Sequence, residues 1–254
     1  MKTLTKEMQN AITPKMALDL LKDGNKRFVN NLKVNRNLLQ QANDTSDGQH
    51  PFAVILSCID SRTSAELIFD QGLGDVFSIR IAGNIVNEDI LGSMEFGCKV
   101  AGAKIIIVLG HTKCGAVKGA CDDVSLGNLT ALISKIKPAV QQESVTNELR
   151  NSNNGEFVEN VSVLNVRQSV NNVLLNSAII AEMVKNDEIM ILGGMHNIGT
   201  GEVVFFDKIA RVAIKAMLEP TEEMVSIGQA TDPGIFNGVA PAIYKAMIDA
   251  ALKE

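Results

Sequence analysis

Short apolar runs bounded by turn residues recur along the chain and predict the strands of a buried sheet. Three runs are almost continuously apolar, which is typical of strands covered on both faces of a parallel sheet. A fourth run alternates between apolar and polar residues, and a fifth predicts a further strand or an edge strand. In chain order these runs cover 51–58, 75–82, 104–110, 188–194 and 201–207.

Helices are predicted before the first strand, between several of the strands and in the tail. Thr13 is a suitable N-cap for the first long helix, and Pro14 fits its first turn. Gly102 is placed to end another helix. The predicted helices cover 8–32, 63–70, 89–101, 162–185 and 240–252, the last of them after two turn signals in the tail.

Two polar stretches interrupt this alternation. Residues 33–50 predict an extended linker, and the Asn-rich residues 140–160 predict a surface loop or a frayed helix end. Strands that alternate with helices predict an α/β fold with a mainly parallel central sheet flanked by helices.

Composition narrows the possible partners of this chain. Its 254 residues, 46% of them hydrophobic, allow a substantial core in one large or two small domains. The net charge of −5 and the aromatic content of 4% disfavour nucleic acid or a membrane surface as the main partner. We find no secretory signal and no stretch of roughly 18 apolar residues that could span a membrane. We therefore expect a cytoplasmic protein.

Cysteine and histidine, residue types that often bind metals, follow two of the three most apolar predicted strands. The first strand is followed by CIDSR at 58–62, and the second by GHTKCG at 110–115. Ligands of open α/β sheets bind outside the carboxyl ends of the strands, so the three ligand candidates converge if the two strands are neighbours. Two thiolates and one imidazole suit Zn²⁺ and leave the fourth position open, as in catalytic zinc sites. These candidates are Cys58, His111 and Cys114.

Asp60 and Arg62 adjoin the first of these residues. An Asp beside an Arg stays ionised and can only accept hydrogen bonds. Zn²⁺ with two thiolates carries no formal charge, so its pull on a bound water is weaker, and a fixed Asp60 acceptor could favour hydroxide. Two other interpretations stay open: a plain surface ion pair, and an Asp60 that binds the metal itself.

The two motifs together resemble those of the β-class carbonic anhydrases. The resemblance extends through GDVFSIRIAGN at 74–84 and covers roughly residues 12–207. It implies one Zn²⁺ per chain held by the three ligand candidates. It also implies hydration of CO₂ to bicarbonate by zinc-bound hydroxide, with Asp60 and Arg62 as the catalytic dyad. We expect one domain over 1–254, with a helical arm and linker at 1–50, a zinc core at 51–220 and a C-terminal extension at 221–254.

The resemblance further implies a homodimer or a dimer-based tetramer whose active sites lie near the dimer interface. It places five residues against the substrate, some of them from the partner chain: Gln49, Phe77, Ala82, Phe96 and Gly115. Several positions depart from the family pattern or divide its branches. Phe96 stands where Tyr is frequent, and Thr63 where Val is common. Ile55 replaces the Trp of the bicarbonate-regulated branch, although Arg80 matches the bicarbonate-binding arginine of that branch. The plant-like branch with an open site is therefore favoured.

Two other functional classes remain open at this stage. Cys58 could be the nucleophile of an enzyme that uses His111, although Ser64 stands where a Cys-x₅-Arg phosphatase needs its Arg. A non-catalytic zinc-stabilised or carbonate-sensing protein would need a closed fourth position. The nucleophile enzyme would contain no metal, and the sensor would not hydrate CO₂. The candidates for proton transfer are two histidines, His50 and His196. The two remaining cysteines, Cys98 and Cys121, are expected to be buried without a role in the chemistry.

Overall fold

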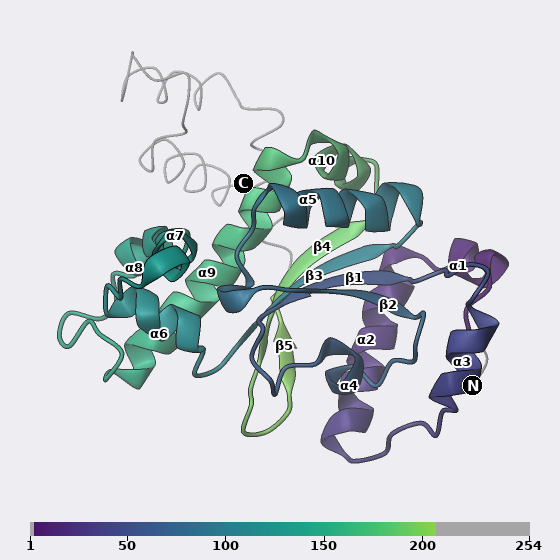
Figure 1. Ribbon diagram of the computed structural model, residues 1–254, viewed down its shortest axis with the longest axis horizontal. Coiled ribbons are helices and arrows are strands. Elements are labelled where there is room, and N and C mark those ends of the chain that lie inside the picture. The colour runs from purple at the N-terminus through teal and green to yellow at the C-terminus, as the bar shows by residue number, and fades with distance from the viewer. Residues whose placement is uncertain (1–2, 207–254) are drawn as a thin grey trace. The chain divides into compact units, whose positions relative to one another are not determined.

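Five strands form one sheet in the order β2-β1-β3-β4-β5 in this computed structural model, which describes residues 3–206 (Figure 1). The first four strands run parallel, and β5 pairs antiparallel with β4 at one edge. The predicted α/β fold is confirmed, and each predicted strand overlaps an observed one. The strands are β1 Ala53–Ser57, β2 Val76–Arg80, β3 Ile105–His111, β4 Met190–His196 and β5 Val203–Phe205.

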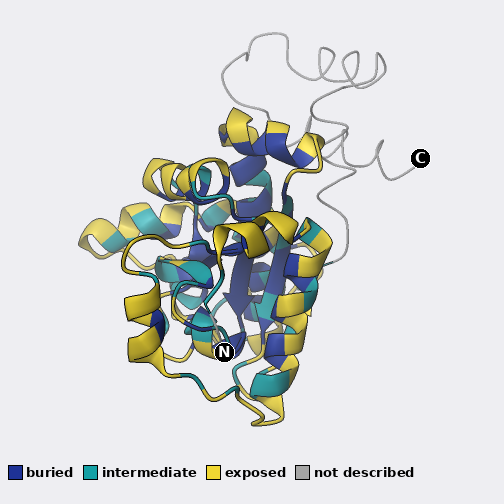
Figure 2. Ribbon diagram, turned by 90° about the vertical axis from the view of Figure 1, so that its right-hand side faces the viewer, coloured by how far each residue is buried: buried dark blue, intermediate teal, exposed yellow. Residues whose placement is uncertain are grey.

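Helices cover both faces of the sheet, so that β1 and β3 are buried along their whole length (Figures 1 and 2). Helices α2 and α4 pack on one face, while α5, the π-helical η2, α9 and α10 lie over the other. The helices are α1 Lys6–Ala11, α2 Pro14–Val29, α3 Leu38–Asp44, α4 Ala65–Ile68, η1 Ala82–Asn84, α5 Glu88–Glu95, η2 Phe96–Val100, α6 Gly115–Cys121, α7 Gly127–Ser134, α8 Lys137–Gln142, α9 Gly155–Asn176 and α10 Ala178–Lys185. Within residues 3–206, none of them is both long and apolar enough to cross a membrane.

Local capping signals explain where several helices begin and end. The Thr13 hydroxyl accepts a hydrogen bond from the backbone of Met16, and Pro14 is the first residue of α2, as predicted. Gly102 follows η2 with a φ of +92°, which confirms it as the end of that helical stretch. The predicted helix over 8–32 is divided into α1 and α2 at this Thr-Pro pair.

Three expectations for the polar and helical segments are corrected. The linker predicted over 33–50 contains α3, which Asn37 caps through its bond from the Gln40 amide. The helix predicted over 162–185 is two helices, because Ser177 ends α9 and caps α10. Helix α9 also begins earlier than predicted, at the Asn154 cap. The predicted extension at 221–254, with its closing helix, lies outside the described residues.

Close packing brings α9 against the end of β3. A Cβ atom on Gly110 would lie 2.5 Å from Cγ2 of Val166 on α9, so only glycine fits here without a shift. The buried apolar residues of α9, including Phe157, Val161 and Val173, attach the helix to the core. Helix α9 therefore runs beside the strand that carries the second metal-binding motif.

A buried carboxylate ties the N-terminal segment to the sheet domain. Asp70, after α4, accepts hydrogen bonds from Arg27 on α2 and from Arg36 in the following loop, each at 2.5 Å. The Asp70 side chain is 4% exposed and that of Arg36 is 6% exposed. Burial by itself raises the pKa of Asp70, but the bonds from the two arginines outweigh it and lower the pKa.

Replacing Asp70 by Ala should therefore lower the free energy of unfolding by about 3–5 kcal/mol, because two partly or fully buried guanidinium groups lose the carboxylate that neutralises their charge. Asp23→Ala, which breaks an exposed pair with Lys26, is the matched control and should change it by less than about 1 kcal/mol. Denaturant titration measures both. Because the folded pKa of Asp70 is depressed, its contribution is present above the unfolded pKa and is lost as pH falls through the folded value. Equal changes in the free energy of unfolding for Asp70→Ala and Asp23→Ala would contradict the stabilising role assigned to the buried Asp70 carboxylate.

Candidate metal centre

The ends of two neighbouring strands bring the candidate ligands together. Strands β1 and β3 pair in parallel, with Ser57 opposite Leu109. Cys58 follows β1 directly, His111 is the last residue of β3, and Cys114 begins the turn into α6. The condition set by the sequence, that these two strands be neighbours, is thus met.

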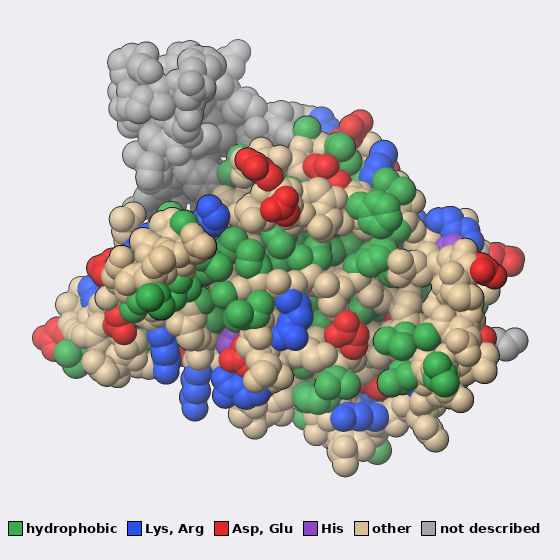
Figure 3. Space-filling view, viewed as in Figure 1, with side chains coloured by type: hydrophobic (Ala, Val, Ile, Leu, Met, Phe, Trp, Pro, Cys, Tyr) green, Lys and Arg blue, Asp and Glu red, His purple; other side chains and the backbone are tan. Residues whose placement is uncertain are grey.

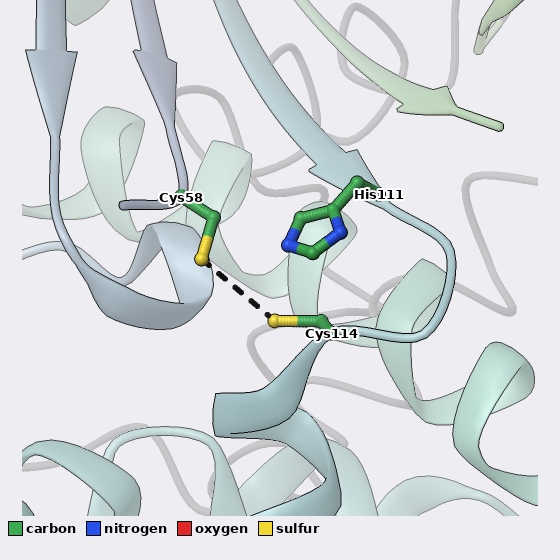
Figure 4. A group of neighbouring side chains, drawn as sticks. All are labelled: Cys58, His111 and Cys114. Carbon is green, nitrogen blue, oxygen red and sulfur yellow. Dashed lines mark hydrogen bonds between the residues drawn. The ribbon is translucent and has the colours of Figure 1, made fainter. Parts of the chain in front are cut away.

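The three side chains point toward one another in a buried space (Figure 4). Their ligand atoms all lie within 4.8 Å of one another, and the two Sγ atoms are 3.9 Å apart. Two sulfur ligands at about 2.3 Å from a tetrahedral Zn²⁺ are about 3.8 Å apart, so the observed separation fits that geometry. Each of the three residues is at most 4% exposed.

His111 presents one nitrogen to this space. Its Nδ1 lies 3.0 Å from the carbonyl oxygen of Thr112, to which it donates when it carries the proton. Its Nε2 is buried and has no hydrogen-bond partner among the described residues. A carbonyl that fixes the tautomer in this way leaves the Nε2 lone pair for a metal. The donor set therefore fits zinc.

The two thiols interact strongly with each other. The hydrogen bond from Cys114 lowers the pKa of Cys58 to about 4, with further help from His111 and from the Gly83 amide, while the same bond and burial raise the pKa of Cys114. A divalent cation held by the two sulfurs would take the place of the proton between them. For His111, burial acts to lower the pKa, but the Cys58 thiolate outweighs it and raises the pKa.

Asp60 and Arg62 form a two-pronged ion pair beside the ligands. Arg62 donates from Nε to Oδ1 at 2.9 Å and from Nη2 to Oδ2 at 2.8 Å, and its backbone amide bonds Oδ1 at 3.0 Å. These bonds from Arg62 hold the pKa of Asp60 well below its usual range, so Asp60 is ionised at neutral pH. The carboxylate is not one of the clustered metal-binding groups of the described residues.

Two side chains fix the backbone between Cys58 and Asp60. Arg80, on β2, donates to the carbonyl oxygens of Cys58 at 3.1 Å and Asp60 at 2.6 Å. Thr63 donates its hydroxyl to the same two carbonyls at 3.2 and 3.0 Å. By resemblance, Arg80 matches a bicarbonate-binding residue, and Thr63 is only a departure from the family pattern. Their shared bonding to this turn was not predicted, because it depends on β2 lying beside β1.

Of the five predicted substrate residues, two lie at the ligands in this protomer. Ala82 begins η1, and the amide of the next residue, Gly83, bonds Cys58 Sγ at 3.4 Å. Gly115 directly follows Cys114, and a Cβ there would meet nothing within 4 Å, so the space beside its backbone is open.

The other three lie elsewhere in the protomer. The rings of Phe77 and Phe96 are 6.2 Å apart and line a depression of about 660 Å³ between β2 and α5. Phe77 pairs with Val54 on β1, four residues before Cys58, which is about 13 Å along the strand. Gln49 precedes β1 and is exposed, at the opposite end of that strand from Cys58. One protomer alone does not bring these residues to the ligands.

The two histidines considered for proton transfer differ in position. His50 precedes β1, whereas His196 ends β4 directly opposite His111. His196 is 3% exposed, and neither of its ring nitrogens has a partner among the described residues. Burial and the nearby His111 lower the pKa of His196 to about 4, so it is a weak proton acceptor at neutral pH.

Known proteins are similar to this chain in sequence and in fold. A family model described as carbonic anhydrase matches residues 53–203. A carbonic anhydrase 2 of Mycobacterium tuberculosis is 32% identical over 200 residues, covering 78% of this chain and 96% of that protein. A carbonic anhydrase of Mycolicibacterium smegmatis is 31% identical over 196 residues, covering 75% and 92%. A tetrameric β-carbonic anhydrase of Sordaria macrospora has a similar structure, with a TM-score of 0.59 and 26% identity over 65% of this chain and 85% of that one.

Proposed function

Because this chain belongs to the β-class carbonic anhydrases, we propose that it hydrates CO₂ to bicarbonate at the centre formed by Cys58, His111 and Cys114, with Asp60 and Arg62 as the dyad. One observation carries this assignment. Two thiols and a buried, unpartnered imidazole nitrogen converge at the sheet edge where α/β proteins bind their ligands. Three protein ligands leave the fourth position for the reacting water.

The chain's own residues orient that reaction. Zinc at this centre supplies the Lewis acid that makes water nucleophilic near neutral pH. Asp60, kept ionised by Arg62, can only accept a hydrogen bond, so it holds the O–H of the attacking water and turns its lone pair to the carbon of CO₂. Arg62 keeps the carboxylate in one orientation through two parallel bonds.

The same ion pair supports the open, plant-like form of the site. An Asp60 that bound the metal would have to give up its three bonds to Arg62. Arg80 is engaged with the carbonyls of Cys58 and Asp60, which speaks against its use as a bicarbonate site in this conformation. We propose that the fourth position is open to water at neutral pH.

A second copy of the chain completes the proposed pocket. Phe77, Phe96 and Gln49 lie away from the ligands of their own protomer, and Phe96 is 54% exposed. Hydrophobic side chains gather over the face that carries α5 and β2 (Figure 3). We propose a homodimer, or a tetramer built from it, in which such residues reach the partner's centre. The similar Sordaria macrospora protein is tetrameric, which supports this assembly. A cytoplasmic location suits the four free cysteines.

Metal analysis joined to a hydration assay tests the proposal. Protein purified without chelator should contain about one zinc per chain, as a Cys₂His site predicts. Stopped-flow measurement should detect CO₂ hydration that is lost when zinc is removed and restored when it is returned. Metal-free protein with undiminished activity would contradict the proposal, and so would fully zinc-loaded protein without activity. Absence of metal with a reactive Cys58 would instead favour a cysteine-nucleophile enzyme.

A further inference from the structure

Polar side chains of α9 bond the backbone of the loop that carries His111 and Cys114, and also the backbone of η1, whose Gly83 amide bonds Cys58 Sγ. Glu159 Oε1 accepts the amide of Lys113 at 2.8 Å, between His111 and Cys114. Further along the helix, Asn165 Nδ2 donates to the carbonyl of Gly83 at 2.8 Å. Ser169 Oγ donates to the next carbonyl, that of Asn84, at 3.0 Å. One helix therefore contacts both sides of the centre.

Glu159 bonds the loop between His111 and Cys114, here called the ligand loop, at a residue whose backbone is strained. Lys113 has a φ of +59°, in the left-handed region that is unfavourable for a residue with a side chain. This conformation turns the chain sharply, so that His111 and Cys114 face the same space although only two residues separate them. The hydrogen bond from the Lys113 amide to the Glu159 carboxyl group stabilises this conformation.

The bond from Asn165 acts on the opposite side. Gly83 has a φ of +68°, and its amide bonds the Sγ of Cys58 at 3.4 Å. Asn165 is 1% exposed and holds the carbonyl of the same residue. Burying a side-chain amide costs free energy unless its polar atoms are bonded. Here the Gly83 carbonyl satisfies Nδ2 of Asn165, whereas its buried Oδ1 has no partner among the described residues. The direction of the Gly83 amide toward the thiolate is thus set from α9.

We propose that Glu159 and Asn165 are positioning residues: Glu159 holds the loop between His111 and Cys114, and Asn165 holds Gly83, whose amide bonds Cys58 Sγ, so that the ligands keep their metal-binding geometry. Helix α9 is suited to this role because its apolar face packs on β3, as the close approach of Val166 to Gly110 shows. The inference rests on the proposed ligand set, but it does not depend on the hydration reaction. Its consequence is that loss of either bond leaves a loop that zinc must order as it binds.

Glu159→Ala should weaken zinc binding about 10–100-fold, the usual effect of removing an outer contact of a metal site. Competition with a chromophoric zinc chelator measures the affinity, and denaturant unfolding of the metal-free protein measures stability. Glu159→Gln keeps an acceptor oxygen and should restore most of the affinity. Glu156→Ala is the matched control, because it removes the same charge from an exposed position one turn earlier and should bind zinc like the parent.

Asn165→Leu, which keeps the branched skeleton but removes both polar atoms, tests the second contact through faster loss of zinc to excess chelator. If this buried substitution prevents folding, the partly exposed Glu159 still decides the question. Parent affinity in Glu159→Ala would overturn the inference while leaving the proposed function intact, and so would an equal loss in Glu156→Ala. Parent protein that binds no zinc would instead refute the ligand set itself.

Discussion

Asp60→Asn should retain about one zinc per chain and lower kcat for CO₂ hydration about 10²–10⁴-fold, the usual effect of losing a group that handles the reacting proton. Asp60 accepts only, and its bonds to Arg62 keep its pKa far below neutrality. An asparagine can present an N–H where the acceptor is needed, and it leaves Arg62 without its counter-ion. The ligands are unchanged, so metal binding should persist.

Stopped-flow hydration and metal analysis on the same preparation measure both expectations. Asp23→Asn serves as control, because Asp23 forms an exposed pair with Lys26 on α2, and this variant should behave like the parent. Parent-like turnover in Asp60→Asn would show that Asp60 is only a surface partner of Arg62. Loss of zinc in that variant would place Asp60 among the ligands and exclude the open form.

Cys114→Ser should lose both its zinc and its activity. A neutral serine hydroxyl is a poor substitute for a thiolate, and the remaining ligands, Cys58 and His111, are too few for a stable tetrahedral site. Cys121→Ser is the matched control, because it removes another buried thiol from the same stretch of chain. Burial raises the pKa of Cys121 to about 11, so this thiol stays protonated and is not expected to bind metal.

Zinc content by elemental analysis separates the two serine variants. Retention of one zinc per chain in Cys114→Ser would remove this residue from the ligand set. Loss of zinc in Cys121→Ser, with folding intact, would mean that Cys121 also binds zinc, although its thiol does not belong to the cluster of ligand atoms formed by Cys58, His111 and Cys114. Unfolding curves of the metal-free proteins ensure that the comparison reports binding and not collapse of the fold.

The strands could be predicted from sequence because each has a local cause. Buried parallel strands require uninterrupted apolar runs, and those of β1 and β3 are easily recognised. Helix α3 was missed since its sequence is polar and its buried residue, Gln41, accepts a bond from the distant Leu73 amide. The start of α9 was missed because the Asn154 cap stands among other asparagines that are equally suited to a loop.

In the candidate site, too, the residues with a local sequence signal could be predicted, whereas contacts that depend on the tertiary structure could not. Cys58, His111 and Cys114 lie in short motifs at strand ends, so the sequence could propose them together. Glu159 and Arg80 could not be assigned their contacts, since those depend on which helix or strand lies beside each loop. The resemblance implied that some of the substrate residues come from the partner chain, but it did not indicate that Gln49, Phe77 and Phe96 are the ones that lie away from the ligands of their own protomer.

The spacing of the two ligand sulfurs also links this centre to cellular redox chemistry. At 3.9 Å, Sγ of Cys58 and Sγ of Cys114 need to approach by only about 2 Å to reach the length of a disulfide bond. Oxidation that joined them would remove both thiolates from the ligand set at once. Zinc and oxidants would therefore compete for the same two atoms, so that bound metal would shield the chain from oxidation and a reducing environment would preserve its capacity to take up metal.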